Sequence, residues 1–411
     1  MNAGLFFGKK RSKKEKTNER LPMKKKSVAP SYAEDGVNLV EGDTFSKFCG
    51  GVCRSTYEYS HLIKVNDMSE GHFRGPRTFR IRTGISKYCQ LSGDCDGNGT
   101  RVIMDAIANT PESAATTLIA MTGMDGVRYG GRNGLLLNQL DTSSLGKNGD
   151  SVNKFFRSAI ASLGNLAKQQ GLVLLKGETA EMGPCVGSQS LDISVRFTWC
   201  GTMISVFHPD VMITGTELAP GQTLIALREY GLRGNGGSSA RKAFAKRYGP
   251  EWYKVPAAQQ DIQQVAAPCV LYENFLQFLN GWNDLSSTGA PQPHIRISAI
   301  AHITGGGIPS KLFGDILKPA GFSCVLDNLW APPPIMTKLV EWRGISGKEP
   351  YDTYHCGGGV IAVVDKADVQ RFCEIANTFG HEAKPVGEIF KKKGKPTLSI
   401  RSQFDSRTYT W

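Results

Sequence analysis

The feature that most constrains the fold is an alternation of short, strand-like apolar runs with longer helical patterns. Strand-like runs occur at residues 78–82, 88–91, 134–140, 172–175 and 193–204. Helical patterns lie between several of them, at 112–121 and 151–169, and in the second one apolar side chains recur every three to four residues. This alternation is typical of an α/β protein, so we expect an α/β (α+β) fold.

A second unit is expected after a turn-rich break at Leu218–Gln222. The elements expected there are a strand at 223–227, helices at 238–246 and 265–279, a strand that runs into the glycines of 302–307, and a late strand at 359–364. A chain of 411 residues is too long for one ordinary core. We therefore predict a tail at residues 1–30, an N-terminal domain at 31–215 and a C-terminal domain at 216–411.

The net charge of +12 is concentrated at the N-terminus. Residues 1–30 contain ten Lys or Arg and two Glu, a net charge of +8, which leaves +4 for the rest of the chain. A tail with so few apolar residues is expected to be disordered. It is either a solvated extension or a segment that contacts nucleic acid, and we expect nucleic-acid contact only there.

The hydrophobic content of 40% fits a globular protein, and no apolar run approaches the roughly 20 residues of a membrane helix. The N-terminus also has no apolar stretch long enough for a signal peptide. We therefore expect a cytoplasmic protein without a membrane partner.

Acidic residues follow or end several of the apolar runs. In GDCDGNGTR, residues 93–101, the spacing of Asp94, Asp96 and Asn98 matches part of an EF-hand loop, but the preceding residues do not form a helical pattern. The alternative is a strand-end turn in which Asp96 faces a metal–phosphate and Thr100 and Arg101 reach phosphate oxygens.

A second acidic pair, Glu178 and Glu181, follows the apolar run 172–175 in the segment GETAEM. The two residues would share a face of a helix, or would cluster at the end of a strand, where α/β sheets bind ligands. They serve either as a helix cap with an exposed charge or as ligands of Mg²⁺. Asp125 is a third candidate, although taken alone it resembles a polar residue at a helix end.

Two glycine clusters, Gly231–Gly237 and Gly305–Gly307, offer backbone amides to phosphate groups. Neither matches a Walker loop or a dinucleotide fingerprint. Taken alone, His302 is more often a structural histidine than a catalytic one.

In chain order these segments resemble the phosphoribosylformylglycinamidine cyclo-ligases, also called aminoimidazole ribonucleotide (AIR) synthetases. GETAEM is identical to the family motif, GDCDGNGTR is similar to S-G-T-D-G-V-G-T-K, and LIAMTGMD is similar to L-V-A-M-x-x-N-D. The resemblance extends through SYAEDGVNLVEGD, GLRGNGGSSARK, AIAHITGGGIP, YHCGGGVI and VGEI, and covers about residues 31–390.

The resemblance implies two α/β domains and a homodimer whose N-terminal sheets form a shared barrel. It implies ATP and Mg²⁺ as cofactors, and the family suggests K⁺. The implied reaction is phosphorylation of the formyl oxygen of formylglycinamidine ribonucleotide by ATP, followed by ring closure in de novo purine synthesis.

The resemblance also implies roles for individual residues. The implied metal ligands are Asp96, Asp125, Glu178 and Glu181. The implied catalytic residues are Asp96, Glu178, Asn235 and His302. The implied cofactor-binding residues are Gly36, Val37, Asn38, Gly42, Asp43, Thr100, Arg101 and Asn138. The implied substrate-binding residues are Arg233, Asn235, Thr304, Gly305, Gly306 and Gly307.

The sequence departs from the family pattern at nucleotide-side and substrate-side positions. Arg101 stands for a lysine, Arg233 for a histidine, Asn138 for an aspartate and Met124 for an asparagine. Two alternatives therefore remain open: an ATP-dependent phosphotransferase of the same superfamily with a different acceptor, and a catalytically idle nucleotide-binding protein.

Overall fold

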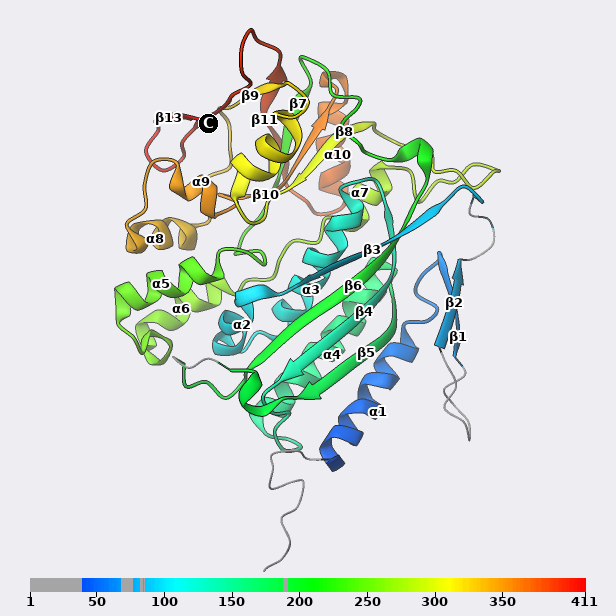
Figure 1. The fold of residues 1–411 in the computed structure, drawn as a ribbon, viewed down its shortest axis with the longest axis vertical. Coiled ribbons are helices and arrows are strands. Elements are labelled where there is room, and N and C mark those ends of the chain that lie inside the picture. Colours follow the sequence, from blue (N-terminus) through cyan, green and yellow to red (C-terminus); the bar gives the residue numbers. More distant parts are fainter. Residues whose placement is uncertain (1–38, 68–76, 82–83, 85, 188–190) are drawn as a thin grey trace, which may run out of the picture.

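Figure 1 shows a computed structural model of the chain, which describes residues 39–67, 77–81, 84, 86–187 and 191–411. The basic tail, residues 1–30, lies outside the described residues. One sheet is built from segments before residue 208, and a second, larger sheet from segments after residue 222. The first sheet occupies the lower part of Figure 1 and the second the upper part. The prediction of an α/β fold is confirmed.

The N-terminal half contains a four-stranded sheet and a separate hairpin. Its strands and helices are α1 (Leu39–Ser55), β1 (Ile63–Asp67), β2 (Arg77–Ile81), β3 (Gln90–Gly97), α2 (Val102–Ala108), α3 (Pro111–Val127), β4 (Arg132–Thr142), α4 (Ser151–Gln170), β5 (Val173–Glu181) and β6 (Phe197–Phe207). The four-stranded sheet has the order β3-β6-β4-β5, in which only β4 and β5 run parallel, and β1 pairs with β2.

Helices α3 and α4 cover one face of this sheet (Figure 1). Because apolar residues recur every three to four positions in α4, they lie on one side of the helix, and Phe155, Phe156 and Leu163 are buried against the sheet. Asp150 caps the start of α4 by accepting a hydrogen bond from the backbone N–H of Asn153, and Gly171 ends it in the left-handed conformation at φ 64°. The opposite face carries the partly exposed side chains of Leu137 and Ile204.

The C-terminal half contains a seven-stranded sheet of order β13-β12-β9-β11-β7-β10-β8, in which only β12 and β9 run parallel. Its strands and helices are β7 (Thr223–Arg228), α5 (Gly237–Tyr248), α6 (Pro256–Val265), α7 (Glu273–Leu279), β8 (Ile297–His302), β9 (Ser323–Leu326), α8 (Pro334–Arg343), α9 (Glu349–Thr353), β10 (Gly358–Val364), α10 (Val369–Thr378), β11 (Ala383–Phe390), β12 (Leu398–Arg401) and β13 (Thr408–Thr410). A π-helix, Pro309–Leu317, follows β8.

Several predicted elements differ in the structure. The strand predicted at 88–91 is β3, which continues to Gly97, so Asp96 lies within it and not in a turn at its end. Of the helix predicted at 265–279, only Glu273–Leu279 is helical within it, as α7; α6 ends at Val265, and Pro268 in the gap lacks a backbone N–H and disfavours a helical residue before it. The strand predicted to run into 302–307 ends at His302, since Gly306 and Gly307 adopt positive φ. The strand predicted at 172–175 continues to Glu181 because it stays paired with β4 over its whole length.

The two halves share a core. Met104 and Ala108 of α2 belong to the same buried cluster as residues of α5, α6 and the seven-stranded sheet. Met124 and Val127 at the end of α3 pack with α7, β7 and β10. The ends of α2 and α3 therefore lie at the junction between the halves. No helix of the described residues is long and apolar enough to cross a membrane.

Candidate active site

Three carboxylates gather where β3 passes the end of α3. Asp94 and Asp96 alternate along β3, so they project from the same face, the one that α3 covers. Asp125 comes from the last turn of α3. The pKa of Asp125 is raised to about 6, chiefly by burial; Arg128 opposes this shift, whereas Asp96 and Asp94 add to it. The structure thus brings Asp96 and Asp125 together, with Asp94 beside them.

This arrangement fits a Mg²⁺ ion that is shared with phosphate groups. Oδ2 of Asp94 is buried and accepts no hydrogen bond from the described residues. Burial raises the pKa of both Asp94 and Asp96, so the protein itself compensates their charge only in part. Within the described residues, no three acidic, His or Cys side chains are placed to hold an ion by themselves. Mg²⁺ is commonly bound by one or two carboxylates and completes its shell with water and phosphate oxygens.

Glu178 and Glu181 lie on opposite faces of β5, because they are three residues apart in a strand. Asp96, Gly201, Asn138 and Gly177 are neighbours across the sheet, so Glu178 projects from the face opposite Asp96. There it is exposed and lines a concavity of about 490 Å³ with Lys176, Gln139, Cys95 and Cys200. Asp96 also lines this concavity, although its side chain leaves β3 on the opposite face.

Glu181 holds a loop in place. Its Oε1 accepts hydrogen bonds from the backbone N–H of Leu145, at 2.7 Å, and from Oγ of Ser144, at 3.4 Å. The structure therefore does not gather the four predicted metal ligands into one cluster. It places Asp96 and Asp125 together, Glu178 on the outer face of the sheet and Glu181 against the loop that follows β4.

Two glycine-rich segments, one from each half, touch at the junction. A Cβ on Gly99 would lie 3.3 Å from the backbone oxygen of Gly234, and a Cβ on Gly237 would lie 2.9 Å from Oγ1 of Thr100. Gly236, at φ 88°, precedes the first turn of α5, and Oγ of Ser238 donates to Oγ1 of Thr100 at 3.3 Å. The N–H groups at the start of α5 therefore lie beside Thr100, an arrangement that suits an anion.

Arg101 is fully buried and is occupied by protein partners. Its Nη2 donates to Oγ of Ser113 and to the backbone oxygen of Ala267, both at 2.6 Å, and its Nε lies 3.5 Å from Oδ1 of Asp105. Its guanidinium joins the N-terminal half to the segment between α6 and α7. The structure shows Arg101 in this linking role.

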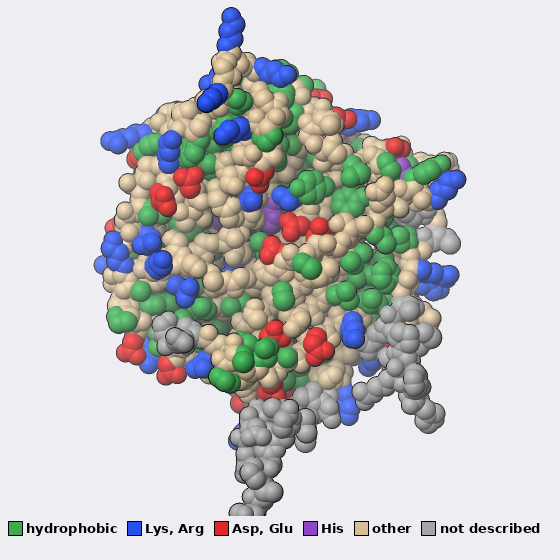
Figure 2. Space-filling model, in the orientation of Figure 1, with side chains coloured by type: hydrophobic (Ala, Val, Ile, Leu, Met, Phe, Trp, Pro, Cys, Tyr) green, Lys and Arg blue, Asp and Glu red, His purple; other side chains and the backbone are tan. Residues whose placement is uncertain are grey.

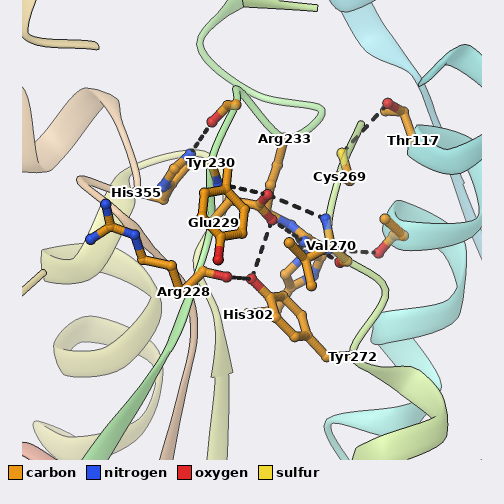
Figure 3. Close-up of polar contacts among 12 residues, drawn as sticks. Thr117, Arg228, Glu229, Tyr230, Arg233, Cys269, Val270, Tyr272, His302 and His355 are labelled. Carbon is orange, nitrogen blue, oxygen red and sulfur yellow. Dashed lines mark hydrogen bonds and ion pairs between the residues drawn. The ribbon is translucent and has the colours of Figure 1, made fainter. Parts of the chain in front are cut away.

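Arg233 lies at the centre of a buried polar network, drawn in Figure 3. Its Nη1 donates to Oε2 of Glu229 at 2.6 Å, and its Nη2 donates to the backbone oxygen of Ala120 in α3 at 3.2 Å. Its Nε donates to Nε2 of His302 at 3.2 Å. The hydroxyl of Tyr272 also donates to Glu229, at 3.3 Å.

His302 is held neutral in this network. Burial, followed by the charges of Arg233, Arg128 and Lys311, lowers its pKa well below the usual value. Because Nε2 accepts the hydrogen bond from Arg233, the ring proton is assigned to Nδ1. His302 therefore serves as a neutral hydrogen-bonding group at the end of β8.

The loop after β8 brings the remaining substrate-side residues to the junction. Thr304, Gly305 and Gly306 are accessible, and Nδ2 of Asn235 lies 3.6 Å from where a Cβ of Gly305 would be. Gly307, at φ 59°, is buried, and a Cβ there would collide with the backbone oxygen of Tyr351.

The residues predicted to cover the triphosphate lie mostly beyond the described part of the chain. Gly36, Val37 and Asn38 fall outside it, and Gly42 and Asp43 lie in α1. Asn138 faces the helix side of the sheet, where its Oδ1 accepts a hydrogen bond from Nε1 of Trp199 at 3.0 Å.

Sequence reasoning assigned no role to Asp94, Arg128 and Lys311 at this junction. Asp94 could have been found, because a residue two positions from Asp96 in a strand shares its face. Arg128 and Lys311 could not, since one directly follows α3 and the other lies in the π-helix, and these segments meet only in the folded chain. In Figure 2, acidic, basic and histidine side chains appear together near the middle of this face.

Comparisons with known proteins support the resemblance. Residues 284–398 match the family described as AIR synthase related protein, C-terminal domain. Phosphoribosylformylglycinamidine cyclo-ligase of Trichlorobacter lovleyi is 27% identical over 361 residues, 87% of this chain and 94% of that protein. The enzyme of the same name from Synechococcus sp. (strain CC9902) is 27% identical over 88% of this chain and 95% of its own length. The predicted resemblance to this family is confirmed.

Solved structures with the same fold have names different from those of the relatives found by sequence. Hydrogenase maturation protein HypE in complex with ATP matches with a TM-score of 0.51 at 14% identity, covering 80% of this chain and 86% of that one. Thiamine-monophosphate kinase from Stenotrophomonas maltophilia K279a matches with a TM-score of 0.54 at 11% identity, covering 88% of this chain and 96% of that one. These likenesses establish the fold.

Proposed function

We propose that this chain, a relative of the phosphoribosylformylglycinamidine cyclo-ligases, uses ATP to close the imidazole ring of formylglycinamidine ribonucleotide in de novo purine synthesis. The observation that carries the proposal is the extent of the similarity, which spans 87% of this chain and 94% of one relative. A likeness confined to one half would support only a shared domain.

The proposed reaction has two steps. ATP phosphorylates the formyl oxygen and converts it into a phosphate leaving group. The ribose-bound nitrogen then attacks the formyl carbon, phosphate departs and the ring closes. A phosphoryl transfer needs mainly positioning and charge neutralisation.

The residues at the junction suit these needs. Asp96 and Asp125 would hold Mg²⁺, which when bound neutralises phosphate charge. Thr100 and the first N–H groups of α5 would orient the phosphate groups. Asn235 and Gly305–Gly307 would line the substrate side, and the neutral His302 would hydrogen bond there without adding charge. Arg101 and Arg233 would position neighbouring segments and would not contact ATP or substrate, because protein groups already accept their hydrogen bonds.

We also propose that two copies pair through the outer face of the four-stranded sheet. Leu91 on β3 is 52% exposed there, beside the partly exposed Ile204 and Leu137. The β1–β2 hairpin covers part of this face, where Ile63 and Val65 belong to the same cluster as Leu137 and Ile204. An apolar sheet face that stays partly exposed is a common dimer interface. Pairing would place Glu178 and Lys176 at the boundary between the two copies.

The test is an assay of purified full-length protein with Mg²⁺ and ATP. We expect ADP release that depends on formylglycinamidine ribonucleotide, together with formation of aminoimidazole ribonucleotide. Asp96→Asn should abolish both while leaving the fold intact, whereas Asp327→Asn, on an exposed loop after β9, should leave both unchanged. ADP release with thiamine monophosphate instead would favour a phosphotransferase, and no turnover with any acceptor would favour an idle protein.

A further inference from the structure

A cavity of about 360 Å³ lies between the end of α3, the linker that joins the two sheets, and the π-helix. Its apolar wall includes Ile213, Leu218, Ile300 and Ile316. Two cations line it, Arg128 from the N-terminal half and Lys311 from the C-terminal half. This cavity adjoins the carboxylate cluster, because Arg128 lies 3.9 Å from Oδ1 of Asp125.

Among the described residues, the guanidinium of Arg128 has one ion pair, from Nε to Oδ1 of Asp125 at 3.9 Å, and no hydrogen bond. Its Nε is buried, and no acceptor among the described residues lies within hydrogen-bonding distance. The group stacks over the ring of Tyr129 at 4.6 Å, which holds it in one orientation. Its side chain remains 27% exposed, so a ligand can reach it. The planar guanidinium can donate two parallel N–H hydrogen bonds, a geometry that matches the oxygens of a phosphate or carboxylate.

Lys311 adds a second positive charge from the other side. Its Nζ forms an ion pair with Asp315 at 3.3 Å, one turn further along the π-helix, and its side chain is 27% exposed. A lysine ammonium has three donors, so it can keep Asp315 and still contact an anion. The charges of Arg128 and Lys311 act on both Asp125 and His302, which places the two cations around one site.

We propose that Arg128 and Lys311 form the subsite for the phosphate monoester of a sugar phosphate. This inference rests on the proposed function, because the ribonucleotide substrate carries such a group. The apolar wall accommodates the carbon atoms next to the phosphate. The guanidinium of Arg128, which forms no hydrogen bond within the described residues, supplies the charge-assisted hydrogen bonds. Asp315 at the rim opposes an anion, so it limits the affinity.

The test measures equilibrium binding of ribose 5-phosphate to the full-length protein by calorimetry, without ATP. Arg128→Gln should weaken binding about tenfold or more, the scale of a lost charge-assisted hydrogen bond. Lys311→Gln should weaken it several-fold, and Asp315→Asn should strengthen it because a repulsive charge is removed. Lys318→Gln, an exposed lysine just after the π-helix and outside the cavity lining, is the matched control and should leave binding within about twofold.

Two further comparisons distinguish a sugar-phosphate subsite from an ATP site and from a general effect of removing a positive charge. Affinity for a non-hydrolysable ATP analogue with Mg²⁺ should fall less in Arg128→Gln than affinity for ribose 5-phosphate does, because Arg128 reaches the proposed Mg²⁺ site only through its ion pair with Asp125. A loss confined to the analogue would assign the cations to ATP and overturn the proposal. Equal effects of Arg128→Gln and Lys318→Gln would also overturn it. Because ribose 5-phosphate binding requires no turnover, a failure of ring closure with intact binding would count against the proposed reaction and leave this subsite standing.

Discussion

The ionised carboxylate of Asp125 destabilises the folded protein at neutral pH, because the group is partly buried. A bound Mg²⁺, which we propose it holds, would offset this effect. The carboxyl of Asp125 has a pKa of about 6 in the folded chain against 3.8 for an unperturbed aspartate. The folded state therefore binds this proton more tightly than the unfolded state does. The contribution of the protonated carboxyl to the free energy of unfolding is therefore complete below about pH 4 and is lost as the pH rises through 6.

Replacing this residue should separate stability from activity. We expect Asp125→Asn to raise the free energy of unfolding at pH 8 by about 1–3 kcal/mol, because the buried charge is removed. The gain should be much smaller near pH 4, where the folded wild-type residue is protonated and the unfolded one partly so, and should vanish only at lower pH. Urea denaturation in EDTA at both pH values measures this, and ATP turnover should be lost. A variant that is less stable than wild type at pH 8 would contradict the argument.

Strand β5 contains two glutamates, Glu178 and Glu181, that contribute differently to stability. Glu181 accepts a backbone hydrogen bond at 2.7 Å, whereas Glu178 has an exposed side chain. We expect Glu181→Ala to lower the free energy of unfolding by about 1–2 kcal/mol, because the N–H of Leu145 loses its acceptor. Glu178→Ala should change stability by less than about 0.5 kcal/mol. Chemical denaturation of the pair measures the difference, and equal losses would contradict it.

Helix α7 begins with a buried acid that faces the junction. Glu273 is 1% exposed, and neither carboxylate oxygen has a hydrogen-bond partner among the described residues. Its pKa is raised to about 8, chiefly by burial; the positive charge of Arg233 opposes this shift and the negative charge of Glu229 adds to it.

The consequence is a pH-dependent stability that Glu273→Gln should remove. The stability due to the protonated acid is complete below about pH 4.5 and is lost as the pH rises through 8. The wild-type protein should therefore lose up to about 1.4 kcal/mol per pH unit across this window from this one residue. Unfolding free energies between pH 5 and 9 measure the slope. A slope that is the same in the variant would show that other groups cause it.

For the whole molecule, Arg101 couples the two halves. Arg101→Met should cost about 3–5 kcal/mol, because it leaves Asp105 buried without its partner. The double variant Arg101→Met/Asp105→Asn should recover part of this loss. Arg247→Met, on the exposed face of α5, is the control and should stay within about 0.5 kcal/mol. Unfolding followed separately by tryptophan fluorescence and circular dichroism would detect uncoupling of the halves as non-coincident transitions.

The fold could be anticipated from the sequence where periodicity is regular, as in α4 and β4. Motif order predicts that Asp96 and Asp125 act together, but not their local structure. Asp96 is expected in a turn after a strand and lies within β3, and the helix predicted at 112–121 ends before Asp125, which lies in the last turn of α3. The role of Arg101 could not be anticipated, since its partners Ser113 and Ala267 are 12 and 166 residues away along the chain. The sequence could not show that Glu178 and Asp96 project from opposite faces of the sheet. That arrangement requires β5 to continue past residue 175, and its pairing with β4, which sets its length, is visible only in the folded structure.

The contact between Gly99–Thr100 and the start of α5 has a thermodynamic consequence. In the proposed nucleotide site, each half would supply only part of the anion-binding surface, so that surface would exist only while the halves are docked. A nucleotide held there would therefore stabilise docking by the same free energy with which docking increases its affinity. The ligand would act as a clamp between the halves. A chain cut in the linker near residue 220 would be expected to reassociate more tightly as the nucleotide concentration rises.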